Sequence, residues 1–253
     1  MDRPAAGQAW SATGYAAHAG FVPVLGRPVI DLLAPEAGEE IVDIGCGDGV
    51  LTAEIAATGA RVTGVEPDPD LAAAARGRGI TVLKQDAHAP FGEARFDAAV
   101  SNAALHWMRD PAAVFGNVHR ALRPGGRFAA EQGGFGNVAA IRVALDAALE
   151  AAGLRAPDPG PWDFPTPDLQ RRRLLAAGFD VVSIGLVPRP TPLPTGFGGW
   201  LRTFAGRYVD DLTPDDRARV LSDTVRRLVH LTDEGGTCVA DYVRLRFAAV
   251  ARA

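Results

Sequence analysis

The sequence is poor in several features that mark particular classes of protein. Its 253 residues include only two cysteines, Cys46 and Cys238, which are too few for a disulfide framework and too isolated for a CxxC metal site. Lys84 is the single lysine among 26 basic residues, and a formal charge of −4 gives no excess of positive charge for nucleic acid or anionic lipid. No apolar run approaches the ~20 residues that cross a bilayer.

These absences exclude membrane, disulfide-rich and nucleic-acid-binding classes. The first residues, MDRPAAGQAW, lack the apolar stretch of a secretion signal, so we expect a cytoplasmic protein without a membrane partner. We also expect no nucleic-acid partner, no metal, and either a monomer or a homodimer. Hydrophobic residues make up 47% of the chain, which is ordinary for a globular protein, and the length fits one large α/β domain or two small ones.

Short apolar runs alternate with helical patterns between residues 41 and 131. We interpret the runs at 41–45, 61–66, 80–84, 96–101 and 127–132 as strands, and the patterns near 50–58, 68–77 and 111–121 as helices. Asp68 and Asp110 each precede a proline, which favours a helix start. Strands separated by helices form parallel sheets with helices on both faces, so the pattern predicts a doubly wound α/β fold.

The alternation becomes irregular after residue 132. Helices are predicted at 136–153 and 167–177 and over most of 197–231, and strands at 179–187 and 242–251. The chain therefore reads as a helical segment, 1–33, followed by a domain over 34–253.

Two insertions interrupt this domain, at about 137–166 and 190–237. Connections of this length in a compact domain are usually functional lids or disordered. The aromatic residues within them, among them Trp162 and Trp200, favour helical lids over disorder.

A glycine-rich turn follows the first predicted strand, in the segment IVDIGCGDG. Glycine lets the backbone approach a ligand closely, and the N–H groups at a helix start favour electron-rich groups. Such a turn alone could bind NAD or FAD, or be a tight turn only. Its spacing is GxGxG rather than GxGxxG, and Asp43 and Asp48 would face a pyrophosphate unfavourably. Carboxylates suit a cationic cofactor better than an anionic one.

Acids or amides also stand at the ends of the next three strands. Glu66 ends the second, Asp86 follows the third and Asn102 follows the fourth. In α/β nucleotide folds an acid at the position of Glu66 binds ribose hydroxyls, and Asp86 could accept a hydrogen bond from an adenine amino group. Open α/β sheets bind ligands outside the carboxyl ends of their strands, so we predict a site at this edge.

The motifs occur in an order that resembles the class I S-adenosylmethionine-dependent methyltransferases. These motifs are IVDIGCGDG, VTGVEPD, KQDA, FDAAVSN and LRPGGRF, over residues 39–132. The flanking segments SNAALHW, PWDFPTP and ADYVRLRF resemble a small-molecule subgroup, to which trans-aconitate and malonyl-carrier-protein O-methyltransferases are more distantly similar. The resemblance implies a Rossmann-like, seven-stranded, mostly parallel sheet whose last strand is antiparallel.

The resemblance also implies S-adenosyl-L-methionine as cofactor and a small-molecule acceptor. Asp43, Gly45 and Gly47 would hold the methionine moiety, Glu66 the ribose, Asp86 with Ala87 the adenine, and Asn102 with its neighbours the methionine side. The predicted cofactor-binding set is Tyr15, Asp43, Gly45, Cys46, Gly47, Glu66, Pro67, Asp86, Ala87, Asn102, Ala103 and His106. The Asn-Pro-Pro-Tyr motif of enzymes that methylate DNA bases and protein amides is absent, because Ala-Ala-Leu follows Asn102.

Methyl transfer from a sulfonium mainly requires that acceptor, methyl and sulfur be held in line. A carboxylate acceptor needs no base, whereas a phenol, amine or activated carbon gains about 10²–10⁴-fold from one. The candidate catalytic residues are His106, His18 and Glu131, with Tyr15 close to His18 in the sequence. We expect Gly133 and Gly134 to leave space beside Glu131.

Each of these assignments has a purely structural alternative. His106, His18 and Tyr15 could be packing residues, and the aromatic residues of the insertions could be the core of a lid. The predicted acceptor-lining residues are Tyr15, His18, Trp107, Trp162, Trp200 and Phe204. For the whole protein, the alternatives to a methyltransferase are a non-catalytic or regulatory protein that binds the same cofactor, and an NAD-dependent oxidoreductase.

Overall fold

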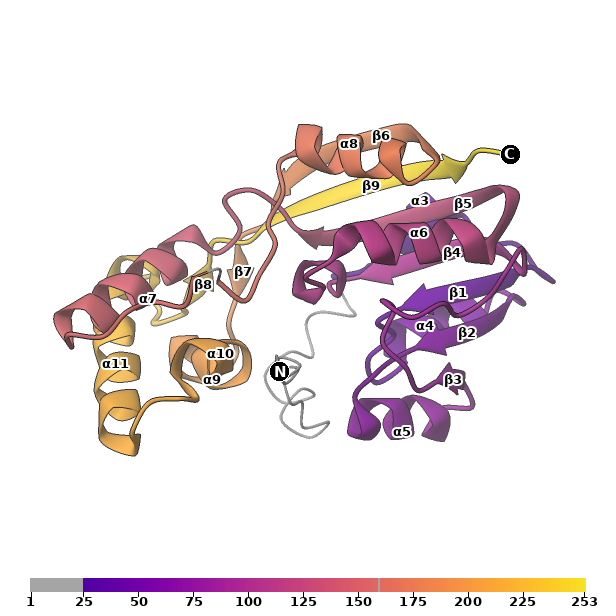
Figure 1. Cartoon of the computed structure of the whole chain (residues 1–253). Coiled ribbons are helices and arrows are strands. Elements are labelled where there is room, and N and C mark those ends of the chain that lie inside the picture. The colour runs from indigo at the N-terminus through magenta and orange to yellow at the C-terminus, as the bar shows by residue number, and fades with distance from the viewer. Residues whose placement is uncertain (1–24, 159) are drawn as a thin grey trace, which may run out of the picture. The chain divides into compact units, whose positions relative to one another are not determined.

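A seven-stranded sheet forms the centre of the structure, with the strand order β3-β2-β1-β4-β5-β9-β6 (Figure 1). The computed structural model describes residues 25–158 and 160–253, so Tyr15 and His18 lie outside the described residues. The strands are β1 (Glu40–Ile44), β2 (Arg61–Val65), β3 (Thr81–Leu83), β4 (Phe96–Asn102), β5 (Leu122–Gly133), β6 (Phe179–Pro188) and β9 (Val243–Ala251). β9 runs antiparallel to β5 and β6, and the remaining pairs are parallel, which confirms the predicted sheet.

Helices cover both faces of this sheet. They are α3 (Arg27–Leu33), α4 (Val50–Ala56), α5 (Pro69–Gly77), α6 (Pro111–Ala121) and α8 (Pro167–Ala176). Apolar side chains of α3 and α4 pack with Ile41 and Val100 on one face. On the other face, α6 and α8 bury Phe115 and Leu174 against the sheet (Figure 1). The doubly wound arrangement follows from strands that are apolar on both faces.

The predicted helix starts at Asp68 and Asp110 are confirmed. The Asp68 carboxylate accepts hydrogen bonds from the N–H groups of Asp70 and Leu71, and the Asp110 carboxylate accepts one from Ala113. Both helices begin with proline, whose missing N–H would have no partner there anyway.

β5 begins five residues earlier than the apolar run at 127–132 predicts. Leu122 pairs with Phe96, and the register then shifts so that Ala98 pairs with Arg127. The exposed Arg-Pro-Gly segment between them is looped out of the ladder. An isolated pairing residue before such a segment has no period-2 signal in the sequence.

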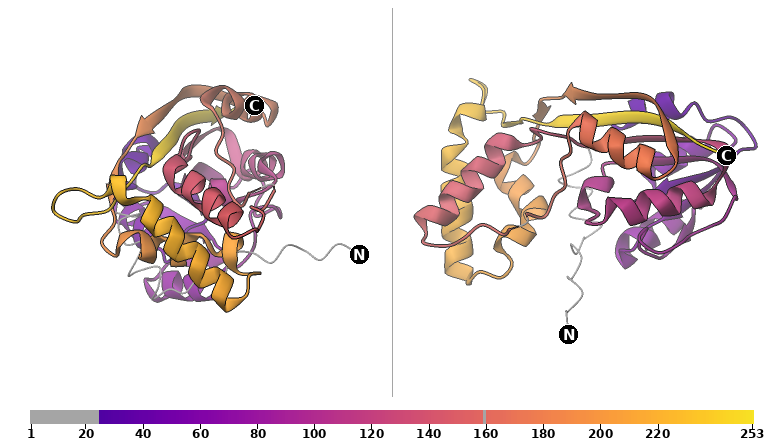
Figure 2. Two further views of the ribbon diagram at one scale, coloured as in Figure 1. Left: turned by 90° about the vertical axis from the view of Figure 1, so that its left-hand side faces the viewer. Right: turned by 45° about the horizontal axis from the view of Figure 1, so that its top comes forward.

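The chain divides into two compact units. The described residues of the sheet unit are 25–137, 162–189 and 242–253, and those of the helical unit are 138–158, 160–161 and 190–241. The helical unit contains α7 (Ala139–Ala151), α9 (Gly196–Phe204), α10 (Gly206–Val209) and α11 (Pro214–Arg227), with α7 packed along α11 (Figure 2).

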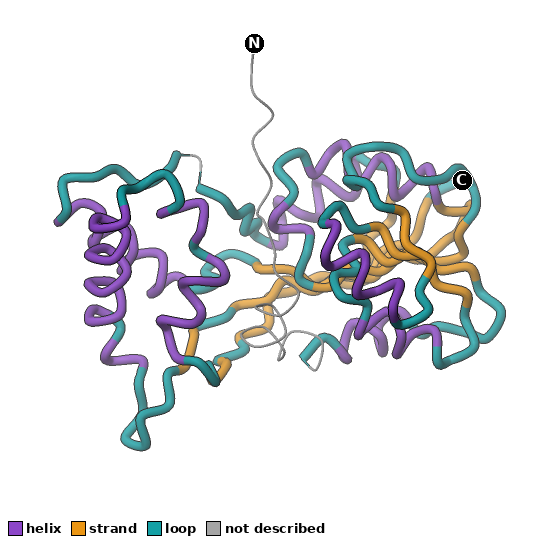
Figure 3. Tube along the Cα trace, turned by 90° about the horizontal axis from the view of Figure 1, so that it is seen from below, coloured by secondary structure: helices purple, strands orange, loops and turns teal. Residues whose placement is uncertain are grey.

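A small second sheet within the helical unit was not predicted. It pairs β7 (Thr191–Pro192) with β8 (Val239–Ala240), two strands of two residues each (Figure 3). Strands this short do not show the alternation of apolar and polar residues that indicates a strand in a sequence. Among the described residues, no helix combines the length and the apolar character needed to span a bilayer.

Candidate active site

The glycine-rich turn after β1 combines a tight contact with open space. A Cβ atom on Gly45 would overlap the Cβ of Ala104, so the loop after β4 lies directly against this turn. Gly47 has a φ of +57°, which disfavours other residues, and no atom lies within 4 Å of where its Cβ would be. A ligand could therefore approach the backbone at Gly47.

The Glu66 carboxylate borders the same open space. Glu66 is 6% exposed, and it accepts hydrogen bonds from the N–H of Gly47 at 3.0 Å and of Asp68 at 2.9 Å. Burial raises the pKa of Glu66, although the two N–H groups oppose this effect. Because a carboxylate has about four acceptor positions, the group is oriented and can still accept bonds from a ligand.

Asp43 lies inside β1 and is 2% exposed. Its carboxylate accepts a hydrogen bond of 2.7 Å from the Thr52 hydroxyl of α4. Burial raises the pKa of Asp43 to about 6, and repulsion from Glu66 adds to the rise. A positively charged ligand beside these carboxylates would favour their ionised forms.

Cys46 and Pro67 lie close to these acids in the sequence, and Cys46 is buried whereas Pro67 is exposed. Burial raises the pKa of the Cys46 thiol, and the neighbouring acids Asp43 and Glu66 add to the rise. The thiol is therefore not activated as a nucleophile. Pro67 is exposed directly after Glu66.

A side chain of α6 holds the loop after β3 in place. The Asn117 amide donates to the carbonyls of Ala87 and His88 at 3.0 and 2.9 Å. Asp86 is exposed and accepts from the backbone N–H of His88 at 3.0 Å, whereas Ala87 is buried. The loop therefore presents an acid at its surface on a fixed backbone.

The end of β4 has a strained conformation next to β5. Ala103 has a φ of 57°, in the left-handed region that non-glycine residues seldom adopt, and its N–H donates to the carbonyl of Glu131 at 2.7 Å. Asn102 pairs with Glu131 in the sheet register. The Ser101 hydroxyl donates to the Ile44 carbonyl at 2.8 Å and so ties β4 to β1.

His106 is buried in the short helix η1 (Leu105–Trp107). Its Nδ1 accepts a hydrogen bond of 3.3 Å from the Gly133 N–H, which assigns the ring hydrogen to Nε2. Burial lowers the pKa of His106 well below its ordinary value, and the Arg244 guanidinium lowers it further. Burial therefore favours the neutral ring, whose Nε2–H is then a donor.

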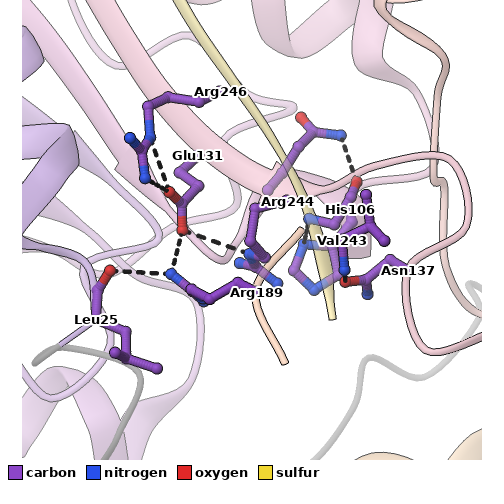
Figure 4. Close-up of polar contacts among 10 residues, drawn as sticks. Leu25, His106, Glu131, Asn137, Arg189, Val243, Arg244 and Arg246 are labelled. Carbon is purple, nitrogen blue, oxygen red and sulfur yellow. Dashed lines mark hydrogen bonds and ion pairs between the residues drawn. The ribbon is translucent and has the colours of Figure 1, made fainter. Parts of the chain in front are cut away.

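Glu131 is completely buried and is surrounded by arginines (Figure 4). One oxygen accepts from Arg189 at 2.6 Å and the other from Arg246 at 2.6 and 2.9 Å. Arg244 lies farther away, with its Nε 3.5 Å from the carboxylate. Both carboxylate oxygens of Glu131 are therefore engaged by arginines.

The expectation that Gly133 and Gly134 leave space beside Glu131 is wrong. A Cβ on Gly133 would overlap the Phe164 ring, and one on Gly134 would overlap Leu186 and Leu245. The glycines are required by close packing of neighbouring segments, which the sequence alone does not show.

The aromatic candidates fall into two groups. Trp107 and Trp162 are half-buried and lie edge to face with ring centres 5.8 Å apart, and Trp162 stacks on Phe164. Trp200 and Phe204 are buried in the helical unit, where their rings pack against each other at 5.2 Å. Trp107 and Phe164 lie against the His106 ring, whereas Trp200 and Phe204 belong to the core of the helical unit.

Sequence reasoning missed the residues that orient the predicted ones. These are Thr52, Asn117, Arg189, Arg244 and Arg246. The alternation Arg-Leu-Arg in the last strand was a usable signal, because residues two apart in a strand point to the same face. Their partner on β5 depends on register, however, which only the structure supplies.

Comparison with known proteins gives a consistent family. A methyltransferase domain model matches residues 42–130. An uncharacterized methyltransferase of Schizosaccharomyces pombe is 36% identical over 95% of this chain and 97% of its own. A demethylmenaquinone methyltransferase of Corynebacterium kroppenstedtii is 36% identical over 38% of this chain and 42% of its own.

A solved structure with the same fold carries a cofactor product. Haemonchus contortus phosphoethanolamine N-methyltransferase 2, in complex with phosphomonomethylethanolamine and S-adenosylhomocysteine, matches with a TM-score of 0.60 at 16% identity. The match covers 96% of this chain and 57% of that one. The family match, the near full-length relative and the sheet order agree, and the chain belongs to the class I S-adenosylmethionine-dependent methyltransferases.

Proposed function

We propose that the protein transfers a methyl group from S-adenosylmethionine to a small-molecule acceptor at the carboxyl edge of β1, β2 and β4. The observation that carries the cofactor site is the pairing of Gly47 with Glu66. An oriented carboxylate and an open glycine backbone lie side by side where this fold binds ligands.

The residues present fit this cofactor. Its sulfonium and ammonium groups are cationic, and Asp43 and Glu66 are buried acids whose pKa values are raised chiefly by burial, so a neighbouring positive charge would favour their ionised forms. Its ribose has hydroxyl donors for the Glu66 carboxylate. Its adenine has an amino group that could donate a hydrogen bond to Asp86, which is exposed on the fixed loop after β3.

The residues of this chain contribute mainly by orientation. S-adenosylmethionine supplies an electrophilic methyl group on a positively charged sulfur. Gly47 and Glu66 would hold the ribose side, while Asp43 would place negative charge near the methionine side. Asn102 and Ala103, fixed by the bond to Glu131, would border the reacting end. Trp107 and Trp162 would exclude water from it.

His106 enters this proposal as a hydrogen-bond donor. Its Nδ1 is occupied by the Gly133 N–H, and burial lowers its pKa, which disfavours a second proton on the ring. An acceptor that must lose a proton would therefore need another base. An acceptor that is already anionic needs none.

Two features support a small-molecule acceptor. The Asn102-Ala-Ala-Leu segment differs from the Asn-Pro-Pro-Tyr motif of enzymes that act on bases and protein amides. The characterized relatives and neighbours reported above are named for small acceptors, demethylmenaquinone and phosphoethanolamine. The similarity to the trans-aconitate group and the role of the insertions as lids stay predictions.

Calorimetry and a labelling experiment test the proposal. S-adenosylmethionine and S-adenosylhomocysteine should bind the purified protein, NAD should not, and Glu66→Ala should weaken binding about ten- to a hundredfold. With methyl-labelled cofactor and a cell extract, label should enter the low-molecular-weight fraction. Label in protein or nucleic acid would contradict the small-molecule acceptor, and binding without turnover would support the non-catalytic alternative.

A further inference from the structure

Three arginines surround the single carboxylate of Glu131. Glu131 is the acid that Arg189, Arg244 and Arg246 contact among the residues that the structure describes. Short hydrogen bonds from Arg189 and Arg246 already engage both of its oxygens. Arg244 is therefore left with a long contact to a carboxylate that is shared.

Arg244 is the least satisfied of the three. Its side chain is 3% exposed, and its Nε has no hydrogen-bond partner within the described part of the chain. Its guanidinium carbon lies 5.7 Å from the centre of the Tyr242 ring. A buried guanidinium with these contacts is costly, because its counter-ion is distant and is shared with two other arginines.

The cluster lies at the same sheet edge as the proposed cofactor site. Glu131 pairs with Asn102 on one side and with Arg246 on the other, and Gly133 pairs with Arg244. Neighbouring strands are ~4.8 Å apart, so β9 lies roughly 10 Å from β4.

His106 connects the two regions. Its ring contacts the Gly133 N–H, and it is close enough to Arg244 for the guanidinium to lower its pKa. A neutral donor, Nε2–H, and a buried guanidinium are both suited to an oxyanion, which accepts hydrogen bonds.

We propose that Arg244, with Arg189 and Arg246 oriented by Glu131, forms a binding site for an oxyanion of the methyl acceptor, a carboxylate or a phosphate. The proposal rests on the proposed function and narrows its acceptor to an anionic molecule. Glu131 then acts as a positioning residue, because it fixes two of the arginines without contacting the acceptor.

Isothermal titration of the protein saturated with S-adenosylhomocysteine tests this proposal. The probes are succinate, its neutral analogue succinamide, and inorganic phosphate, all at one ionic strength. The variants are Arg244→Met and the charge-retaining Arg244→Lys. The matched control is Arg61→Met, which removes an exposed arginine paired with Glu40 on the same sheet.

We expect at least one anion to bind the wild type and succinamide not to bind. Arg244→Met should weaken that anion about ten- to a hundredfold, Arg244→Lys should weaken it less, and Arg61→Met should leave it unchanged. Binding of succinate alone assigns a carboxylate to the acceptor, and binding of phosphate alone assigns a phosphate.

Several results would overturn the proposal. They are the absence of binding by either anion, equal binding of succinate and succinamide, or an equal loss in Arg61→Met. Thermal melting gives an independent readout, because removing an unmatched buried charge should keep or raise the Tm in Arg244→Met. A lower Tm with unchanged anion affinity would show a structural role only. If S-adenosylhomocysteine itself fails to bind, the proposed function fails, not this inference.

Discussion

Asp43 is a proposed cofactor-binding residue whose burial also affects stability. Its carboxyl is buried in β1, and desolvation raises its pKa from 3.8 to about 6. A carboxyl group whose pKa is higher in the folded state stabilises the fold below its unfolded pKa, and this contribution disappears as the pH rises through about 6. The protein without ligand is thus destabilised at neutral pH by an acid that a cationic cofactor would use.

Asp43→Asn should therefore raise the free energy of unfolding relative to the wild type as the pH increases from about 4 to 6. The full difference is about 3 kcal/mol, since one pKa unit corresponds to about 1.4 kcal/mol. Asparagine can still accept the hydrogen bond from Thr52. Urea denaturation across this pH range measures the effect.

The same variant should bind S-adenosylmethionine more weakly, because it has lost a negative charge near the cation. A gain in stability combined with a loss of affinity is the signature of a functional acid. If Asp43→Asn is less stable than the wild type at every pH, Asp43 instead has a structural role.

A substitution at Gly47 tests whether the open space beside its backbone accommodates the cofactor. Gly47→Ala should weaken cofactor binding at least about tenfold, because its methyl group would occupy the position that a ligand approaches, and the residue would be strained at a φ of +57°. The strain should lower stability by about 1–2 kcal/mol. Gly116→Ala is the matched control: Gly116 lies on α6, also with no atom near its Cβ position, and its substitution should leave affinity unchanged. Normal binding by Gly47→Ala would mean that the glycine only shapes the turn.

His106 leads to a prediction about pH. Its pKa is lowered, first by burial and then by Arg244, so the ring stays neutral as the pH falls through its ordinary value near 6.5. Turnover should show no decline with a midpoint near 6.5. If turnover does fall near pH 6.5 and His106→Gln abolishes that fall, the histidine acts as a base, as the sequence analysis predicts.

At the scale of elements, the loop after β3 depends on α6. The buried Asn117 amide donates to the buried carbonyl of Ala87 and to the part-buried carbonyl of His88, and leaving a buried carbonyl without a partner costs about 1–3 kcal/mol. Asn117→Leu should therefore weaken cofactor affinity through the adenine side while leaving kcat little changed. Arg120→Ala, at an exposed position of the same helix, is the control. A fall in kcat at unchanged affinity would contradict this assignment.

The elements themselves were largely predictable, and their pairing was not. The strands at 41–45 and 61–66 and the helix starts at Asp68 and Asp110 follow from local signals, namely apolar runs and capping residues. The contact of Glu131 with Arg246 depends on how β9 aligns with β5. Register is a long-range property, set by the packing of the whole sheet, and a single sequence does not encode it in any local pattern.

At the scale of the molecule, the predicted cofactor residues that the structure describes all belong to the sheet unit. The resemblance to a known family predicted this set because its motifs follow one another at strand ends. The arginine cluster combines residues 131, 189, 244 and 246, which lie in three separate strands or strand ends, so no motif contains it. What the sequence missed is this cluster, because it is assembled from distant segments.

The division into two units predicts an uneven response to the cofactor. A ligand protects the unit that it binds from local unfolding, and each compact unit can open separately. With saturating S-adenosylhomocysteine, amide hydrogen exchange should slow in residues 43–49, 64–68 and 85–88 and remain unchanged in α11. Slowing of α11 to the same extent would show that the two units unfold together.

Adding an acceptor should then slow amide exchange in residues 195–210 if the insertions are lids, whereas unchanged exchange there would argue for a fixed structural role.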